Sequence, residues 1–288
     1  MATTIPSAFA GLLKNLELTT LQATTVSTRQ QNVRDAVKND FSVLDDFLVG
    51  SYRRSTMIAP LKTADVDVFL VLDSKHYVSN GQASLLDATR RALLKTYTRT
   101  PRVSRNGQAV TITFTDFEVD VVPGFHRKGG GYLIPDSVLN RWIETDPKQH
   151  VEIWATENKA HGGNLVPVVK MMKCWNRAHS LLLHSFHLET VTLGVLKGIG
   201  ITDYPSGVRF VLDKAREAVK TTIADPAGYP GALGGYLNTK DKLDAVIARL
   251  DAALIQAREA ERLASTGNVR GSIEKWRVVF GDNFPGYG

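Results

Sequence analysis

The stretch Ala64-Asp65-Val66-Asp67-Val68-Phe69-Leu70-Val71-Leu72 places two carboxylates at the start of an apolar run. The run is rich in Val, Leu and Phe, which is typical of a β-strand. Side chains two residues apart on a strand project from the same face, so Asp65 and Asp67 are predicted to point together. A second apolar stretch, Phe117-Glu118-Val119-Asp120-Val121-Val122, is also predicted to be a strand. If the two strands are neighbours, Asp120 joins the pair.

Three converging carboxylates repel one another unless a cation lies between them. Oxygen ligands on a rigid edge suit Mg²⁺, which binds one or two carboxylates and leaves its other positions to water and phosphates. About fifteen residues upstream, Gly50 and Ser51 form a turn that is predicted to open a helix. Free backbone N–H groups and a hydroxyl at such a turn attract anions. The pattern therefore predicts a phosphate site beside a metal site.

Composition bounds the class of protein. The chain has 288 residues, 43% of them hydrophobic and 22% charged, which is typical of one large globular domain or two packed lobes. No apolar run reaches the roughly 18 residues of a membrane span, and the first residues lack a signal-peptide pattern. The single cysteine, Cys174, excludes an internal disulfide and a thiolate zinc site, and it is predicted to be an inert core residue. We therefore expect a cytoplasmic protein with no membrane partner.

Net charge leaves two interpretations open. The formal charge is +6 with a pI near 9.3, which suits an anionic partner such as nucleoside triphosphates or nucleic acid. Many soluble proteins carry a similar charge with no specific partner. Because no run of five basic residues occurs, no basic tail is expected.

The first half is predicted to be a mixed α/β lobe. We expect helices over 6–40, 41–48 and 82–97, and strands over 66–72 and 117–122. Residues 102–114 are predicted to form a hairpin, with Asn106-Gly107 indicating a type I′ turn. The Gly-rich, basic segment 125–132 is predicted to be a surface loop, and closure over a substrate is the alternative.

Beyond residue 135 only helices are predicted. The expected ranges are 136–144, 149–159, 165–178, 185–197, 206–223, 240–266 and 269–280. The chain is thus predicted to be α+β, with a catalytic lobe over 1–130 that contains a small mixed sheet and a helical lobe over 131–288 that completes a nucleotide cleft. The N-terminal helices are expected to pack back onto the helical lobe.

Two positions in the helical half are candidates for binding phosphate. Lys170 and Lys173 are three residues apart, and therefore on one face of the predicted helix 165–178. Ser185 is a plausible N-cap of the next helix, where its hydroxyl and the ring of Phe186 can bond a phosphate and stack on a base. His187 and Glu189 are expected to have packing roles, with catalysis as the alternative.

These residues, in this order, resemble the polymerase-β-like nucleotidyltransferases. More narrowly, the chain is similar to oligoadenylate synthetase, cyclic GMP-AMP synthase and the bacterial CD-NTases, the SMODS-type enzymes of CBASS anti-phage systems. The motifs are Gly50-Ser51, Asp65-x-Asp67, Asp120, Lys173-x-Trp175 and Ser185-Phe186-His187-Leu188-Glu189. The resemblance extends from the N-terminal helices to the closing Trp276-Arg277, and the short length is similar to the bacterial members.

The resemblance implies a role for each matched position. Asp65, Asp67 and Asp120 would bind two Mg²⁺, with Mn²⁺ able to substitute. Gly50 and Ser51 would hold the β- and γ-phosphates of the donor, and Lys173 would contact the triphosphate. Ser185 matches a serine of the second lobe, and Phe186 matches a base-stacking tyrosine whose hydroxyl this chain lacks. NTPs are the implied substrates, and a separately encoded effector is the implied responder to the product.

The implied reaction is synthesis of a cyclic di- or oligonucleotide second messenger. One alternative is linear nucleotidyl transfer to RNA, protein or a small-molecule hydroxyl, and another is a non-catalytic nucleic-acid-binding protein. Lacking the zinc-binding insertion of the animal DNA sensor, the chain is not expected to respond to DNA by that route, although another nucleic-acid activator remains open. The sequence leaves open the base choice, ring size, linkage, activating signal and oligomeric state.

Overall fold

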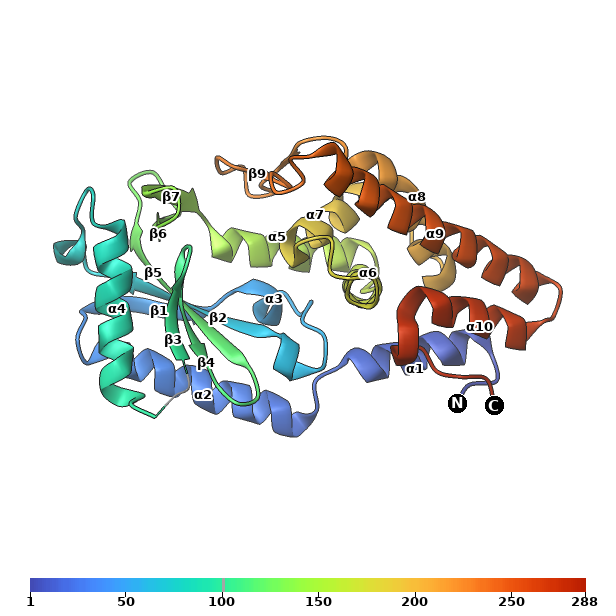
Figure 1. Ribbon diagram of the computed structural model, residues 1–288, viewed down its shortest axis with the longest axis horizontal. Helices are drawn as coiled ribbons and strands as arrows, with labels where there is room; N and C mark the ends of the chain where they lie inside the picture. The colour runs from blue at the N-terminus through green and yellow to red at the C-terminus, as the bar shows by residue number, and fades with distance from the viewer. Residues whose placement is uncertain (100–101) are drawn as a thin grey trace. The chain divides into compact units, whose positions relative to one another are not determined.

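The computed structural model describes residues 1–99 and 102–288, which form two compact units (Figure 1). The sheet unit comprises Leu18–Glu152 and Ala227–Pro230. The helical unit comprises Met1–Glu17, Ile153–Pro226 and Gly231–Gly288. A small mixed sheet in one unit and a set of helices in the other make the fold α+β, as predicted.

The sheet has seven strands. Five of them lie in the order β1 (Val43–Leu48), β2 (Asp65–Leu72), β5 (Glu118–His126), β4 (Ala109–Thr113) and β3 (Arg102–Asn106). β2 and β5 are parallel and the other pairs are antiparallel. β6 (Tyr132–Asp136) pairs with the end of β5, and β7 (Arg141–Thr145) pairs with β6. The predicted strands at 66–72 and 117–122 and the predicted hairpin are confirmed.

Helices cover one face of this sheet. α2 (Thr20–Lys38) and α4 (Gln82–Thr96) contribute apolar side chains to the main core, and so do Val66, Val68, Val119 and Val121 of the two central strands. Alternation along a strand then sends the intervening residues to the opposite face. On that face Phe69 and Val71 pack with Tyr132 and Ile134 of β6, which forms a second, smaller core beyond the aspartates.

Two predicted helices are strands. The segment predicted as a helix over 41–48 is β1, because its backbone pairs with β2, from Val43 opposite Leu72 to Leu48 opposite Val68. The segment predicted as a helix over 136–144 contains the end of β6, a turn over 137–140 and most of β7. In that turn Asp136 Oδ1 accepts the N–H groups of Val138 and Leu139. An aspartate side chain that accepts a hydrogen bond from the backbone N–H two residues later is a turn signal. The prediction of a helix over 136–144 did not take this signal into account.

The hairpin turn is of another type than predicted. Asn106 pairs with Ala109, so the two loop residues are Gly107 and Gln108, and of these Gly107 has positive φ (+63°). Glycine at the first central position is the signature of a type II′ turn, whereas type I′ needs positive φ at both positions. Gly107 does lie in the turn, but the two central residues are Gly107-Gln108 and not the predicted Asn106-Gly107.

The segment after β5 is shorter than the predicted loop. β5 continues through His126 and β6 begins at Tyr132, leaving a tight turn in which Gly129, Gly130 and Gly131 have positive φ. Because β6 and β7 extend the sheet through β5, the division between the units falls after Glu152, inside α5 (Pro147–Ala160), and not near residue 130.

The helical unit is built from α6 (Leu165–Ala178), α7 (Ser185–Leu196), α8 (Tyr204–Ala218), α9 (Lys240–Ser265) and α10 (Val269–Phe280), with α1 (Ile5–Leu16) from the N-terminus. A short pair of strands, β8 (Ile223–Ala224) and β9 (Ala232–Leu233), also belongs to it. Strands therefore continue beyond residue 135, contrary to the prediction. α8 begins earlier than predicted, because Asp203 caps its first turn. It also ends earlier, at Ala218.

The predicted N-terminal helix is two helices. Thr19 caps α2 in a capping box with Gln22, whereas Glu17 has extended backbone angles that end α1. As a result α1 belongs to the helical unit, whereas α2 belongs to the sheet unit, contrary to the expectation that both N-terminal helices pack on the helical lobe.

The ring of Phe9 on α1 is fully buried among aromatic side chains of the same unit. It lies edge-on to Trp276 at 5.0 Å and to Phe284 at 5.1 Å between centroids. Phe9→Ala is expected to lower the free energy of unfolding by about 3–5 kcal/mol, because it leaves a cavity in a closely packed core. Urea unfolding measures this, with Leu21→Ala at an exposed helix position as the control. A loss below about 1 kcal/mol would contradict the packing of α1.

Candidate active site

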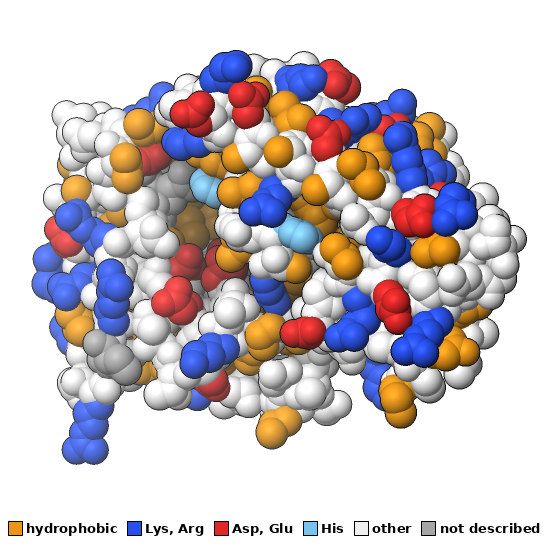
Figure 2. Space-filling model, turned by 45° about the vertical axis from the view of Figure 1, so that its right-hand side comes forward, with side chains coloured by type: hydrophobic (Ala, Val, Ile, Leu, Met, Phe, Trp, Pro, Cys, Tyr) orange, Lys and Arg blue, Asp and Glu red, His pale blue; other side chains and the backbone are white. Residues whose placement is uncertain are grey.

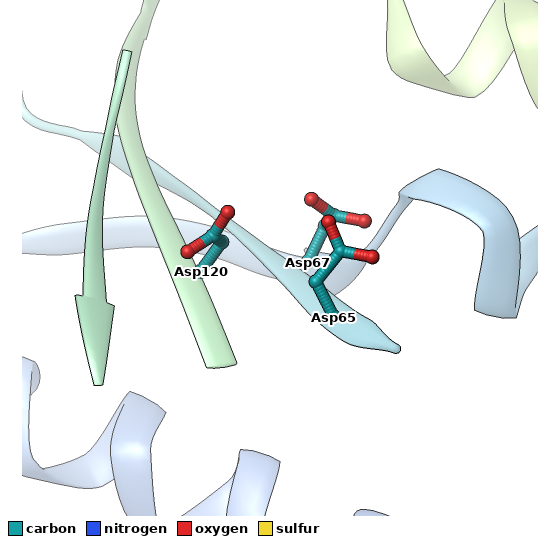
Figure 3. A group of neighbouring side chains, drawn as sticks. All are labelled: Asp65, Asp67 and Asp120. Carbon is teal, nitrogen blue, oxygen red and sulfur yellow. The ribbon is translucent and has the colours of Figure 1, made fainter. Parts of the chain in front are cut away.

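The three aspartates lie together at the start of the two parallel strands (Figure 3). Asp67 of β2 is directly opposite Asp120 of β5 in the register, and Asp65 is two residues before Asp67. A carboxylate oxygen from each lies within 4.8 Å of those from the other two. The sequence predicted this convergence, and the parallel pairing of β2 with β5 produces it, because all three project from the face that α2 and α4 leave open.

Burial perturbs one of these groups. The pKa of Asp120 is raised from 3.8 to about 6, mainly because the side chain is partly buried and also because the negative charges of Asp65 and Glu118 lie nearby. The hydroxyl of Thr111, which lies opposite Asp120 on β4, donates to Asp120 Oδ1, and this hydrogen bond lowers the pKa of Asp120. A carboxylate site that resists full ionisation is one that a cation would stabilise.

The donor set fits a hard divalent cation. Ligand oxygens about 2.1 Å from Mg²⁺ are at most about 4.2 Å apart. The carboxylate oxygens of the three aspartates lie within 4.8 Å of one another, so small side-chain rotations bring them to that distance. The three groups are all carboxylates, with no sulfur or imidazole among them. Asp65, Asp67 and Asp120 are thus able to hold a metal ion of this class.

Gly50 lies against the carboxylate of Asp67. The Val49 N–H donates to the Asp67 carbonyl at 2.9 Å, and the chain then enters the short helix α3 (Gly50–Arg53) with φ of +62° at Gly50. A Cβ atom at this position would lie 1.7 Å from Asp67 Oδ2. Glycine is therefore required here twice, by the positive φ and by the close approach. The predicted turn is adjacent to the aspartates, as the sequence suggested.

Both lysines of α6 are buried and ion-paired within the helical unit. Lys173 Nζ lies 3.1 Å from Glu189 Oε1 of α7, and Lys170 Nζ lies 2.7 Å from Glu17 Oε1 at the end of α1. The sequence suggested two lysines with one shared role. Instead they have different carboxylate partners, one buried and one exposed.

Ser185 and Phe186 open α7. The Ser185 side chain is exposed, and the ring of Phe186 stacks on Trp154 with 5.7 Å between centroids. The predicted position of Ser185 differs by one residue, since His184 is the N-cap. His187 and Glu189 are buried as expected, and so is Cys174, whose pKa burial raises to about 12.

Sequence reasoning missed an aromatic group beside Ser185. Tyr236 stacks on His184 with 3.6 Å between centroids, accepts the His184 backbone N–H at 2.9 Å, and lies 2.8 Å from His187 Nδ1. The rings of Tyr236 and His184 line a cavity of about 540 Å³. Its other lining residues are Leu181, Leu182, Leu237, Asp241, Lys242 and Ala245. Nothing in the sequence pairs Tyr236 with residues about fifty positions earlier.

A small mixed sheet that carries three carboxylates on adjacent strands, with a Gly-Ser turn against one of them, defines a polymerase-β-like nucleotidyltransferase. The chain matches the Second Messenger Oligonucleotide or Dinucleotide Synthetase (SMODS) domain over residues 3–158 and belongs to that family, the CD-NTases. The resemblance drawn from the sequence is confirmed. The protein is a nucleotidyltransferase of the class that builds cyclic oligonucleotides from NTPs.

Individual relatives are similar along the whole chain. A cyclic AMP-AMP-AMP synthase of Acinetobacter is 29% identical over 304 residues, covering 98% of this chain and 86% of the relative. The structure of CdnC with ATP from E. coli has a TM-score of 0.77 at 19% identity, covering 98% of this chain and 99% of that one. The GTP-bound form of Vibrio cholerae DncV has a TM-score of 0.70 at 15% identity, with coverage of 97% and 86%.

Among the described residues, no helix has the length and apolar character needed to cross a membrane.

Asp120→Asn is expected to stabilise the metal-free protein above about pH 6. The folded-state pKa, about 6, exceeds the ordinary 3.8, so the folded state binds more protons between these values and stability falls as pH rises through them. At about pH 8 the ionised group costs on the order of 3 kcal/mol, and the amide avoids this while still accepting the Thr111 hydroxyl.

Urea unfolding with a chelator measures this effect. The Asn variant is expected to gain about 1–3 kcal/mol at about pH 8 and almost nothing at about pH 4. Asp73→Asn, just beyond the other end of β2, is the control and keeps its cap on Lys75 N. Excess Mg²⁺ should stabilise the wild type more than the Asn variant. An equal gain at both pH values would contradict the assignment of the raised pKa to Asp120.

Proposed function

We propose that this chain converts NTPs, ATP among them, into a cyclic di- or oligonucleotide second messenger for anti-phage defence. The observation that carries the proposal is the aspartate triad on parallel strands in a member of this family. The similarity to the Acinetobacter cyclic AMP-AMP-AMP synthase supports ATP as a substrate. A separately encoded effector would respond to the product.

In the proposed reaction a ribose hydroxyl attacks the donor α-phosphorus in line. The new O–P bond forms as the bond to the β-phosphate breaks, pyrophosphate leaves, and the hydroxyl proton passes to a carboxylate. Asp120 is assigned as the acceptor, since it would be the carboxylate that contacts the metal nearest the attacking hydroxyl. A second, intramolecular transfer of the same kind closes the ring.

Asp65, Asp67 and Asp120 would hold two Mg²⁺, or Mn²⁺ in their place. When bound, these ions would lower the pKa of the attacking hydroxyl and neutralise the leaving pyrophosphate. Gly50 and Ser51 are assigned to the donor β- and γ-phosphates, because the backbone of their turn lies against Asp67. The chain's contribution is mainly to position the reactants and to balance their charge.

In the helical unit, Lys173 is assigned to the triphosphate and Ser185 to a phosphate oxygen. Phe186 is assigned to stacking on a base, and its ring already stacks on Trp154 with 5.7 Å between centroids. Lys170 is assigned a weaker part in binding phosphate, because the exposed carboxylate of Glu17 that holds it can be exchanged for phosphate.

Surface charge supports a small-molecule acceptor over RNA. On the face drawn in Figure 2, Lys and Arg side chains are interspersed with Asp and Glu. Several arginines of α8 and α9 are ion-paired, such as Arg216 with Asp251 at 2.7 Å and Arg262 with Glu259 at 2.8 Å. A tailing enzyme needs a continuous basic groove for the RNA backbone.

The test is incubation of the purified protein with all four radiolabelled NTPs and Mg²⁺, followed by phosphatase and chromatography. A phosphatase-resistant product is expected, and it should be absent with EDTA and absent in the Asp65→Asn/Asp67→Asn double variant. Omitting NTPs one at a time identifies the bases. Label that stays on added RNA or protein, with no resistant small product, would contradict the proposed cyclisation.

A further inference from the structure

The ion pair between Lys173 and Glu189 lies inside the helical unit. The two side chains are 9% and 0% exposed, and Nζ is 3.1 Å from Oε1. Lys173 lies in a stretch of α6 that is buried on all sides, where Met172, Cys174 and Trp175 are each at most 1% exposed. Charged groups in such surroundings lose their hydration, and each needs a partner of opposite charge.

Packing alone does not account for this pair. A buried ion pair is often no more stabilising than apolar side chains of the same volume, because desolvation offsets the attraction. Its presence among mostly apolar buried side chains of α6 is explained if the ammonium itself has a task. The carboxylate then fixes where that ammonium lies.

The position of Glu189 connects the pair to the start of α7. Glu189 follows Ser185 by four residues, so the two side chains lie on one face of the helix, about one turn apart. The ammonium of Lys173 is therefore held near the face on which the Ser185 hydroxyl lies. A lysine has three N–H donors, so a bond to Glu189 leaves capacity for phosphate oxygens.

Lys170 provides the contrast. Its carboxylate partner, Glu17, is 56% exposed, so water has ready access to that carboxylate. Glu189 is enclosed, and water has no comparable access to it. Of the two carboxylates, only Glu189 has the burial needed to hold a lysine in one place.

We propose that Glu189 is a positioning residue, which holds the Lys173 ammonium in place to bind the triphosphate of a substrate NTP. The inference rests on the proposed role of Lys173. It goes further by giving a function to a carboxylate that touches neither the nucleotide nor the metal.

Equilibrium binding tests this without requiring catalysis. The probes are the α,β-methylene analogues of ATP and GTP with Mg²⁺, measured by calorimetry on the full chain. Glu189→Gln and Lys173→Met are each expected to weaken binding of the preferred analogue by about 10- to 100-fold. The Lys173→Met/Glu189→Met double variant should bind no more weakly than Lys173→Met, because the two residues act as one unit.

Stability readouts separate positioning from folding. The double variant is expected to recover most of the unfolding midpoint that Glu189→Gln loses, since it leaves no unpaired buried charge, and yet its affinity should stay low. Glu189→Asp should restore part of the affinity. Glu217→Gln is the matched control, because its i, i+3 ion pair with Lys220 is exposed, and it should bind as the wild type does. In active variants KM should rise more than kcat falls.

Two results overturn the inference in different ways. If Glu189→Gln binds the analogue as tightly as the wild type, Glu189 has only a structural role and the proposed function is untouched. If Lys173→Met binds normally, the assignment of Lys173 to the triphosphate is wrong, and the role of Glu189 fails with it. A wild type that binds the analogues but makes no cyclic product would count against the proposed function alone.

Discussion

Asp67→Asn is expected to reduce product formation by about 1,000-fold or more, equivalent to about 4 kcal/mol of transition-state stabilisation. Asp67 is the central member of the triad, two residues from Asp65 on β2 and directly opposite Asp120 on β5. The amide is nearly the same size but carries no charge, so the change removes an anionic metal ligand while leaving the strand pairing intact. The measurement is the initial rate of pyrophosphate release at saturating NTP and Mg²⁺.

Asp73→Asn is the matched control for this variant. It makes the same chemical change just beyond the other end of β2, where the side chain only caps a short turn through Lys75 N. The control should keep most of the wild-type rate, and both variants should unfold cooperatively at similar urea concentrations. An Asp67→Asn enzyme with more than about a tenth of the wild-type rate would show that the carboxylates are not the metal site.

Gly50→Ala is expected to lower the rate by about 100-fold or more, with a smaller effect on folding. The added Cβ would lie 1.7 Å from Asp67 Oδ2, so either the turn or the carboxylate must move. The positive φ of +62° adds a backbone cost of about 1–2 kcal/mol for a residue with a side chain. Displacement of the Asp67 carboxylate lowers the reaction rate, whereas the cost of the positive φ lowers the free energy of unfolding. The rate and the free energy of unfolding can be measured separately.

Gly107→Ala measures the cost of an alanine at positive φ without any contact with a carboxylate. Gly107 has nearly the same φ, +63°, in the same unit, but nothing lies within 4 Å of its Cβ position. It should lose about 1 kcal/mol of stability or slightly more and retain its activity. The predicted contact between Gly50 and Asp67 would be refuted by a Gly50→Ala variant whose rate matches that of Gly107→Ala. Added Mg²⁺ should rescue Gly50→Ala only partly, because the ligand is misplaced rather than removed.

Local patterns in the sequence determined which residues form the carboxylate cluster. The spacing of Asp65 and Asp67 is enough to place them on one face of a strand, since side chains alternate with a period of two. The apolar residues around Asp120 indicated another strand, and the composition of both stretches indicated the sheet. These conclusions need only propensity and periodicity, which are properties of neighbouring residues.

Other features depended on contacts between distant residues. The segment over 43–48 has no strong strand pattern and becomes β1 only because β2 is available to pair with it. The helical interpretation of 136–144 failed for the same reason, since β6 and β7 pair with each other and, through β5, with the sheet.

The tertiary structure also decided what each candidate residue touches. The sequence indicated Asp120, but the parallel register with β2 brings it opposite Asp67, and burial beside Asp65 then raises its pKa. Gly50 was recognised as a turn residue, whereas its contact with the Asp67 carboxylate depends on the fold. The carboxylate partners of Lys170 and Lys173 come from α1 and α7. Residue types and spacing thus determined the chemistry of the site, and long-range packing decided its geometry, because burial and charge depend on neighbours in space.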